Sequence, residues 1–263
     1  MNYLKNKHKG GVSSEKGLQY EMNYAVYKIA RYLLACNEHS VRFQTQIEGA
    51  YVDDLLITVD DDVYNYHQIK NVKGLKWATV ESDFIMQSNQ CTERSENFTI
   101  TLVYSDPQFS TTLSEELKPH TNTLYFPYTT SLYGLINTHT PFKDALKELS
   151  AYDDPSDDLL YGIAEAIAGI WLSSNRMDGA SITDIADRLK KSEINTVLDP
   201  DAEIAMECKT ILDAIPDFSY EIKGKKIIWY SDSFSGSTLW TSRLQNEIIE
   251  NAPSTAKDIF KML

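Results

Sequence analysis

The chain has 263 residues, of which 42% are hydrophobic and 24% charged, and its formal net charge is −13. This balance excludes a disordered chain and is enough for a large buried core in one or two domains. A charge this negative also argues against a general nucleic-acid-binding protein, whose surface is usually basic.

Three cysteines lie far apart without a CxxC pair, which excludes a disulfide framework and favours a reducing compartment. The opening residues are polar and basic, and the most apolar run is too short to span a bilayer. We therefore expect a cytoplasmic protein that makes no membrane contact.

Residues 13–36 are predicted to form a helix with Ser13 or Ser14 as its N-cap, because apolar residues recur there at spacings of three and four. Glu21 follows Leu18 by three positions and so lies on or beside the apolar stripe. A carboxylate in that place is costly unless it is paired. Glu21 is therefore either part of a site or the partner of a nearby lysine.

Strands are predicted at residues 41–48, 53–59 and 64–70, with the second and third paired as an antiparallel hairpin. A helix is predicted at residues 78–90, and a strongly β-prone strand inside the sheet at 97–105. The following stretch is predicted to hold one short strand and one helix. Together these elements predict an α/β domain.

The acidic segment YDDPSDD is the predicted linker between a first domain, residues 1–150, and an accessory domain, residues 151–263. The second domain is predicted to be mostly helical and winged-helix-like: three helices and then a β-hairpin, at residues 157–174, 180–191, 200–215 and 218–232. Its third helix is acidic, so docking to protein is favoured over reading of DNA.

Gln68 and Lys70 share one face of their predicted strand, and Asp54 lies on the neighbouring strand. Metal-assisted cleavage of a phosphodiester requires oxygen ligands for Mg²⁺ and a positive group near the phosphate. Asp54, the Gln68 amide oxygen and the Ile69 carbonyl are the candidate metal ligands. Lys70 is the candidate positive group, and Glu21 is a candidate further carboxylate.

Two choices stay open in this set. Asp53 and Asp54 are adjacent, so only one of them can face the site, and Asp54 is preferred because the strand begins there. Glu48 is a second candidate carboxylate, although it also fits the end of a strand. His67 points to the opposite strand face from Gln68 and is interpreted as a packing residue.

Lysines before and after this set are candidate DNA contacts, namely Lys9, Lys16, Lys73 and Lys76. Each of them also fits an ordinary solvated surface. The five histidines lack zinc-site spacing, and the chain has neither a P-loop nor a dinucleotide fingerprint, so no nucleotide cofactor is expected.

Four stretches resemble one known family: KNKHKGG, GLQYEMNYAVYKIARYLL, QIEGAYVDDLLIT and YHQIKN. They are similar to the PD-(D/E)xK nucleases, and within these to the double-stranded-DNA endonuclease effectors of bacterial anti-phage systems of CBASS and Lamassu type. The resemblance implies a restriction-endonuclease-like mixed sheet flanked by helices. It also implies a Mg²⁺- or Mn²⁺-dependent endonuclease with Glu21, Asp54, Gln68 and Lys70 as catalytic residues.

Cleavage of both strands of a duplex takes two active sites, so a homo-oligomer is expected. A nuclease of this kind needs restraint, and a regulatory partner, with an SMC-like ATPase as one candidate, is expected to supply it. Two other hypotheses stay open: a DNA-binding regulator with a degenerate first domain, and a non-catalytic subunit of a larger complex.

Overall fold

The structure is a computed structural model that describes residues 2–34, 40–111, 113–115, 117–150, 152, 154–192, 206–223, 226–231, 235–240 and 242–262. It consists of two compact units. The first contains Met1–Leu149 with Asp154–Ile194, and the second contains Ser150–Asp153 with Asn195–Leu263.

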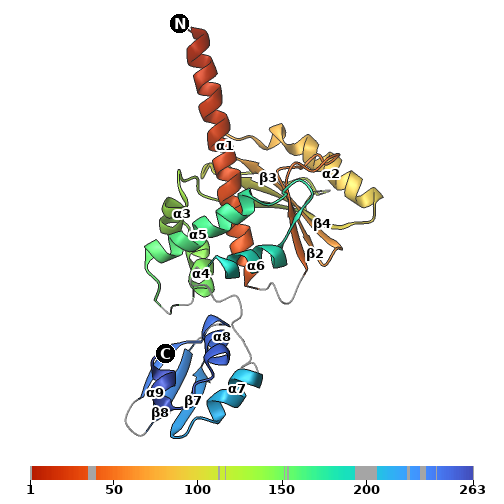
Figure 1. Cartoon of the computed structure of the whole chain (residues 1–263). Coiled ribbons are helices and arrows are strands. Elements are labelled where there is room, and N and C mark those ends of the chain that lie inside the picture. Colours follow the sequence, from red (N-terminus) through yellow and green to blue (C-terminus); the bar gives the residue numbers. More distant parts are fainter. Residues whose placement is uncertain are drawn as a thin grey trace. The chain divides into compact units, whose positions relative to one another are not determined.

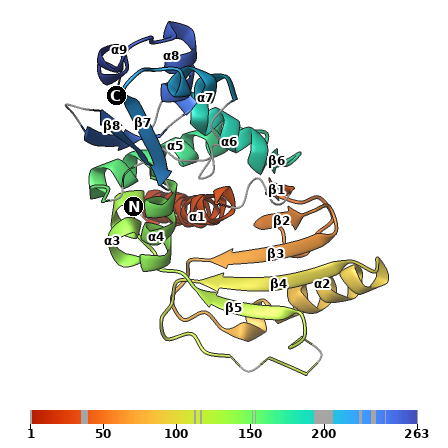
Figure 2. The ribbon, with the colours of Figure 1, turned by 90° about the horizontal axis from the view of Figure 1, so that it is seen from below.

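The first unit is built on a six-stranded sheet of order β5-β4-β3-β2-β1-β6 (Figure 1, Figure 2). Its strands are β1 (Val41–Gln44), β2 (Leu55–Val59), β3 (Val63–Lys70), β4 (Asn97–Tyr104), β5 (Thr121–Tyr125) and β6 (Ala180–Ser181). β1, β2, β3 and β6 pair antiparallel, whereas β3, β4 and β5 pair parallel. The predicted α/β class with a mixed sheet is confirmed.

Helices of the first unit cover the sheet. They are α1 (Asn2–Leu33), α2 (Glu81–Glu93), α3 (Leu132–Thr138), α4 (Thr140–Leu149), α5 (Asp157–Leu172) and α6 (Ile182–Lys191), with a short 3-10 turn η1 at Trp77–Thr79. Tyr66 of β3 packs in the same apolar cluster as Phe84 of α2, while the next residue, His67, contacts Tyr24 of α1. Because neighbouring strand residues face opposite sides, α1 and α2 lie on opposite faces of the sheet.

The predicted hairpin of residues 53–59 and 64–70 is confirmed as the antiparallel pair β2–β3, with Leu55 opposite His67. The β-prone segment at 97–105 is confirmed as β4, an interior strand with four successive buried residues. The first helix, however, begins at Asn2, so the expected N-cap at Ser13 or Ser14 is wrong.

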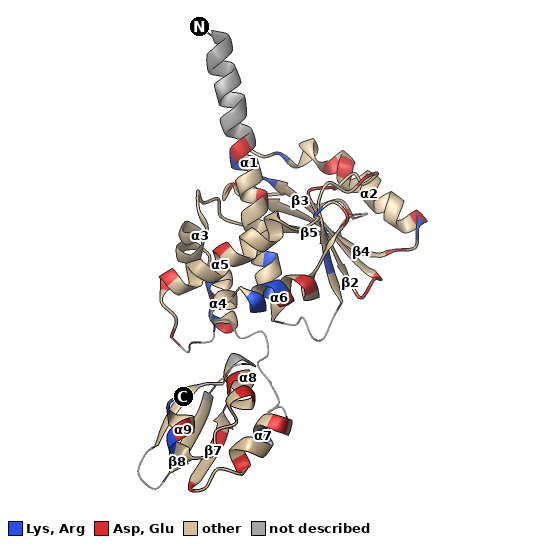
Figure 3. Ribbon diagram, viewed as in Figure 1, with Lys and Arg blue, Asp and Glu red and all other residues tan. Residues whose placement is uncertain are grey.

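The second unit contains α7 (Met206–Asp213), α8 (Ser242–Asn251) and α9 (Ala256–Phe260) with a three-stranded antiparallel sheet, β7 (Phe218–Lys223), β8 (Lys226–Ser231) and β9 (Ser235–Leu239). Acidic residues occur along α7 and α8 (Figure 3). β9 pairs antiparallel with β8. Gly236 of β9 lies against Trp229, since a Cβ on Gly236 would come within 2.6 Å of the indole.

The winged-helix expectation is wrong, because the helices that would form it lie in different units. α5 and α6 belong to the first unit, where Ser181 caps α6 and β6 pairs with β1. α7 joins the second unit with the hairpin β7–β8. The division between units therefore falls mainly after Ile194, not at residue 150. Within the part of the chain that the structure describes, no helix is long and apolar enough to cross a bilayer.

Candidate active site

Three donors converge on one oxygen of Asp54, at the start of β2. The Gln68 side-chain amide donates to Asp54 Oδ2. The Ile69 backbone amide donates to the same oxygen at 2.6 Å, and Lys70 Nζ lies 3.4 Å from it. The side chains of Asp54 and Lys70 are 18% and 35% exposed to solvent, so water and a ligand can reach the pair.

The register of the β2–β3 hairpin brings Asp54 next to these donors. Leu55 pairs with His67, which places the preceding residue, Asp54, beside Gln68. Asp53 is exposed, and its backbone carbonyl accepts from Gln46 N at 2.9 Å. Of the two adjacent aspartates, Asp54 is thus the one that lies with Gln68 and Lys70, as the sequence analysis preferred.

Helix α2 holds the loop that leads into Asp54. The fully buried Gln87 accepts hydrogen bonds from the backbone amides of Tyr51 and Val52, at 2.8 and 3.2 Å. Gln90, one turn later, donates to the Gly49 carbonyl at 2.9 Å. Gly49 has a positive φ of 77°, which a glycine adopts without strain. The chain before Asp54 is therefore fixed from the α2 side of the sheet, the face that also carries Gln68 and Lys70.

Glu21 belongs to α1, the helix that contacts β3. Burial and, to a smaller extent, the nearby Asp54 carboxylate raise the pKa of Glu21 to about 7, while Lys70 acts in the opposite direction. Asp54 and Lys70 are thus close enough to Glu21 to shift its pKa. Glu21 therefore exchanges a proton close to neutral pH.

Oxygen atoms suitable for a hard cation are present here. All contacts to Asp54 fall on Oδ2, so Oδ1 has no partner among the described residues. Backbone N–H and C=O of one strand residue project to the same neighbour, so the Ile69 carbonyl is on the Asp54 side. With the Gln68 amide oxygen this makes a carboxylate, amide and carbonyl set, which suits Mg²⁺ or Mn²⁺. The described residues contain no cluster of three or more His, Cys, Asp or Glu, which a zinc-like centre would use.

Other predicted residues are not brought into these contacts. Glu48 is exposed in the turn before Gly49. Lys16 is exposed in the middle of α1, and Lys73 and Lys76 are exposed in the segment after β3. The side chain of Lys9 lies outside the described residues.

Two positioning residues escaped the sequence analysis, Gln87 and Asn71. Asn71 follows Lys70 directly; its side chain donates to the Lys16 carbonyl at 3.4 Å and accepts from Ser105 Oγ at 2.8 Å. It thereby connects the end of β3 with α1 and β4. Neither residue lies in a recognisable motif, because each acts on partners distant in sequence.

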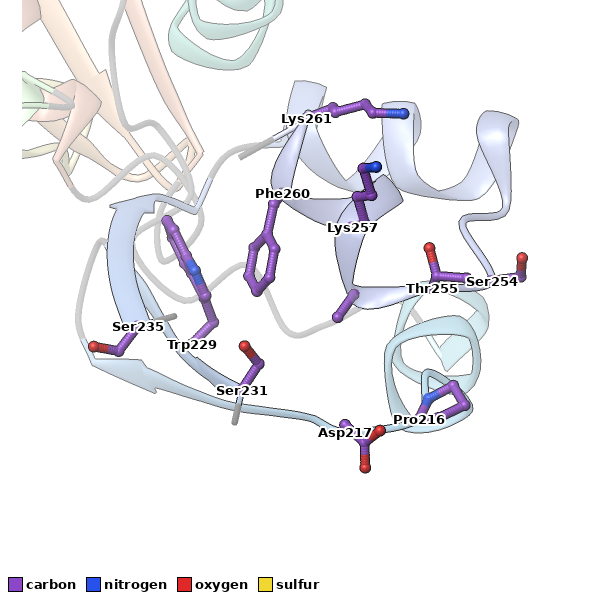
Figure 4. A pocket seen from close by; sticks show the side chains of 11 residues that line it. Pro216, Asp217, Trp229, Ser231, Ser235, Ser254, Thr255, Lys257, Phe260 and Lys261 are labelled. Carbon is purple, nitrogen blue, oxygen red and sulfur yellow. The ribbon is translucent and has the colours of Figure 1, made fainter. Parts of the chain in front are cut away.

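A separate pocket of about 950 Å³ lies in the second unit, between the small sheet and α9 (Figure 4). The rings of Trp229 and Phe260 stand next to each other there, with their centroids 6.4 Å apart. Its lining contains one carboxylate, Asp217, and two lysines, of which Lys261 lies 3.7 Å from Asp258. This lining lacks the paired oxygen ligands that metal-assisted hydrolysis needs.

Searches of family models, curated proteins and solved structures produced no match to this chain.

Proposed function

We propose that the chain is a metal-dependent DNA endonuclease whose active site is the Asp54, Gln68, Ile69 and Lys70 cluster with Glu21. The observation that carries this proposal is the convergence of Gln68, Ile69 and Lys70 on one accessible carboxylate. A merely structural ion pair would need no amide and backbone donors on the same oxygen.

The metal, Mg²⁺ or Mn²⁺, would be held by Asp54, the Gln68 amide oxygen and the Ile69 carbonyl. When bound, such a cation neutralises phosphate charge and lowers the pKa of a coordinated water. Gln68, whose amide nitrogen donates to Asp54, would offer its amide oxygen as a ligand to the cation. The Ile69 amide keeps Asp54 oriented throughout.

Lys70 would stabilise the negative charge that develops on the phosphate oxygens during attack by water. It stays on the site because its ammonium is tied to Asp54. Glu21, with a pKa of about 7, would accept a proton from the attacking water or a water next to it. The two carboxylates thus have separate roles, set by their surroundings.

The substrate and the biological setting rest on the resemblance to PD-(D/E)xK nucleases. The proposal therefore includes the restriction-endonuclease-like fold, cleavage of double-stranded DNA and a role as an effector in bacterial anti-phage defence. It also includes assembly into a homo-oligomer and control by a protein partner such as an SMC-like ATPase. The mixed sheet with α1 on one face and the site at the strand ends supports this family.

A plasmid-cleavage assay tests the proposal. The purified chain is incubated with supercoiled DNA and Mg²⁺ or Mn²⁺, with EDTA as the metal-free control. Asp54→Asn is compared with Asp53→Asn, the adjacent exposed carboxylate. We expect nicking or linearisation by the wild type and Asp53→Asn, and none by Asp54→Asn or in EDTA.

A nuclease that is active only with its partner would not cleave DNA by itself. Mn²⁺ binding to the purified chain is therefore measured in parallel by calorimetric titration. Absence of both cleavage and Mn²⁺ binding would overturn the proposal and favour a non-catalytic subunit. Equal cleavage by Asp54→Asn and wild type would place the activity elsewhere.

A further inference from the structure

Two aromatic rings form one wall of the pocket in the second unit. They belong to Trp229 of β8 and Phe260 of α9, and both side chains are half-buried. Both also pack against the apolar core cluster of this unit. Each ring therefore contacts the core on one side and faces the pocket on another (Figure 4).

The small sheet holds the indole of Trp229 in place. Trp229 pairs with Gly236 of β9, where a Cβ would come within 2.6 Å of the indole. Glycine in a strand permits this close approach, because it has no side chain to collide with the ring. The centroids of the Trp229 and Phe260 rings lie 6.4 Å apart, which is within the range of an aromatic pair. The aromatic wall is thus formed before any ligand arrives, which lowers the entropic cost of binding.

Two lysines bring positive charge to the same pocket. Lys257 lies in α9 and Lys261 directly after it, and residues four apart share one face of a helix. Lys261 pairs with Asp258 at 3.7 Å, but this pair is exposed, and exposed pairs contribute little. The Lys261 ammonium can therefore exchange Asp258 for an anionic ligand.

The other polar groups of the lining limit which anion fits. One carboxylate, Asp217, lies across the pocket from the two lysines (Figure 4). It would repel a second negative charge, so a carboxylate is favoured over a doubly charged phosphate. Three serine hydroxyls add neutral hydrogen-bonding groups, those of Ser231, Ser235 and Ser254. The volume of about 950 Å³ is sufficient for a ligand larger than one ring.

We propose that the second unit binds a ligand that carries a flat aromatic ring and a carboxylate. The ring packs against Trp229 and Phe260, and the carboxylate accepts hydrogen bonds from Lys257 and Lys261. A free aromatic acid and the aromatic C-terminal residue of a peptide share this chemistry. The inference goes beyond the proposed nuclease function and does not depend on it, because every lining residue belongs to the second unit.

Ligand-observed NMR titrations of the full chain test the inference with indole-3-propionate, which carries both groups. Its methyl ester keeps the ring but has no charge, and propionate keeps the carboxylate but has no ring. We expect a Kd of about 1 mM or tighter for indole-3-propionate. Both analogues should bind at least about 10-fold more weakly, because each lacks one of the two contacts.

The peptide Gly-Gly-Gly-Trp, with a free C-terminal carboxylate, distinguishes the two sources of this chemistry. Tighter binding of the peptide than of indole-3-propionate would assign the pocket to the end of a peptide chain. Equal or weaker binding of the peptide would assign it to a free aromatic acid.

Lys257→Met keeps the length of the side chain and should weaken binding of indole-3-propionate roughly 3- to 10-fold. Lys209→Met is the matched control, since Lys209 is exposed on α7 of the same unit and does not line the pocket. Its binding should equal that of the wild type. Trp229→Leu removes half of the aromatic wall and should weaken binding about 10-fold. Melting temperatures establish that each variant is folded.

Equal binding of indole-3-propionate and its methyl ester, or equal binding by Lys257→Met and the wild type, would overturn the inference. So would the absence of binding at about 10 mM indole-3-propionate. If Trp229→Leu does not fold, the methyl ester and Lys257→Met still decide, because neither alters the aromatic wall.

Discussion

Two neighbouring residues of β3, His67 and Gln68, show how one strand separates packing from a site. His67 is buried under α1, accepts or donates one hydrogen bond with Tyr24 Oη at 3.1 Å, and its Nε2 has no partner among the described residues. Burial lowers the pKa of His67 well below its usual value, and the nearby Lys28 lowers it further. His67 is therefore neutral at pH 7.

Gln68 faces the other way and donates a hydrogen bond to the Asp54 carboxylate. The same carboxylate forms an ion pair with the partly exposed ammonium group of Lys70. The difference teaches that a buried polar residue marks a site only when charge is gathered beside it. On the His67 side the strand itself presents only a neutral ring, because an unpaired charge in an apolar layer is very costly. On the Gln68 side charge is retained in a network of donors.

The largest expected effect is a loss of cleavage on substitution of Lys70, which lies on the Gln68 face of β3. Lys70→Met should reduce metal-dependent cleavage about 10³-fold, because the charge developing on the phosphate loses its nearest cation. Lys73→Met, which removes an exposed lysine three residues later, should change the rate only slightly. Rates are measured at saturating Mg²⁺ with equal folded protein. Similar losses in both variants would show that Lys70 has no special role.

Gln87→Met should weaken Mn²⁺ binding about 10- to 100-fold, the range for residues that orient metal ligands. Methionine fills the same space, but the amides of Tyr51 and Val52 lose their acceptor, and the loop before Asp54 loosens. Phe84→Leu is the control, because Phe84 is fully buried on the same helix and has no polar contact with the loop. It should lower the melting temperature while Mn²⁺ affinity stays constant. A parallel loss of affinity in Phe84→Leu would mean that Gln87 acts only through stability.

On the uncharged side, Tyr24→Phe should reduce the free energy of unfolding by about 1–3 kcal/mol, because His67 Nδ1 loses its partner in a dry environment. Chemical denaturation measures this change. Cleavage per folded molecule should remain at the wild-type level. Loss of cleavage without loss of stability would show that the His67 face of β3 also contributes to activity, which would contradict the separation of the two faces.

The smallest expected effect concerns the pH dependence of stability. The pKa of Glu21 is raised to about 7, so the stability linked to its protonation is complete below pH 4.5 and is lost as the pH rises through 7. Glu21→Gln removes this loss and, with the shift discounted because solvent screens this half-buried group, should be about 1–2 kcal/mol more stable than the wild type at pH 8, but not at pH 4.5. Glu15→Gln, at an exposed position of the same helix, should show no such difference. Urea denaturation at both pH values checks this, and a gain equal at both would exclude ionisation of Glu21 as the cause.

Much of the first unit could be predicted from periodicity. The alternation in β2 and β3, the apolar stripe of α1 and the β-prone run of β4 each depend on near neighbours in sequence. The separation of Gln68 from His67 follows from strand alternation alone. The preference for Asp54 over Asp53 needed only the position where the strand begins.

The tertiary structure decided what depends on distant partners. The helices α5 and α6 have the periodicity of any amphipathic helix, and local pattern could not show that they complete the first unit, with β6 pairing to β1. The brace from Gln87 to Tyr51 and the raised pKa of Glu21 likewise arise from residues far apart in the chain. The sequence by itself thus determined strands β2, β3 and β4, though not β6 or β9, and the meeting of Asp54 with Gln68 and Lys70, because these follow from local spacing. Packing determined the boundary between units and the electrostatics of the site, because both depend on which surfaces meet.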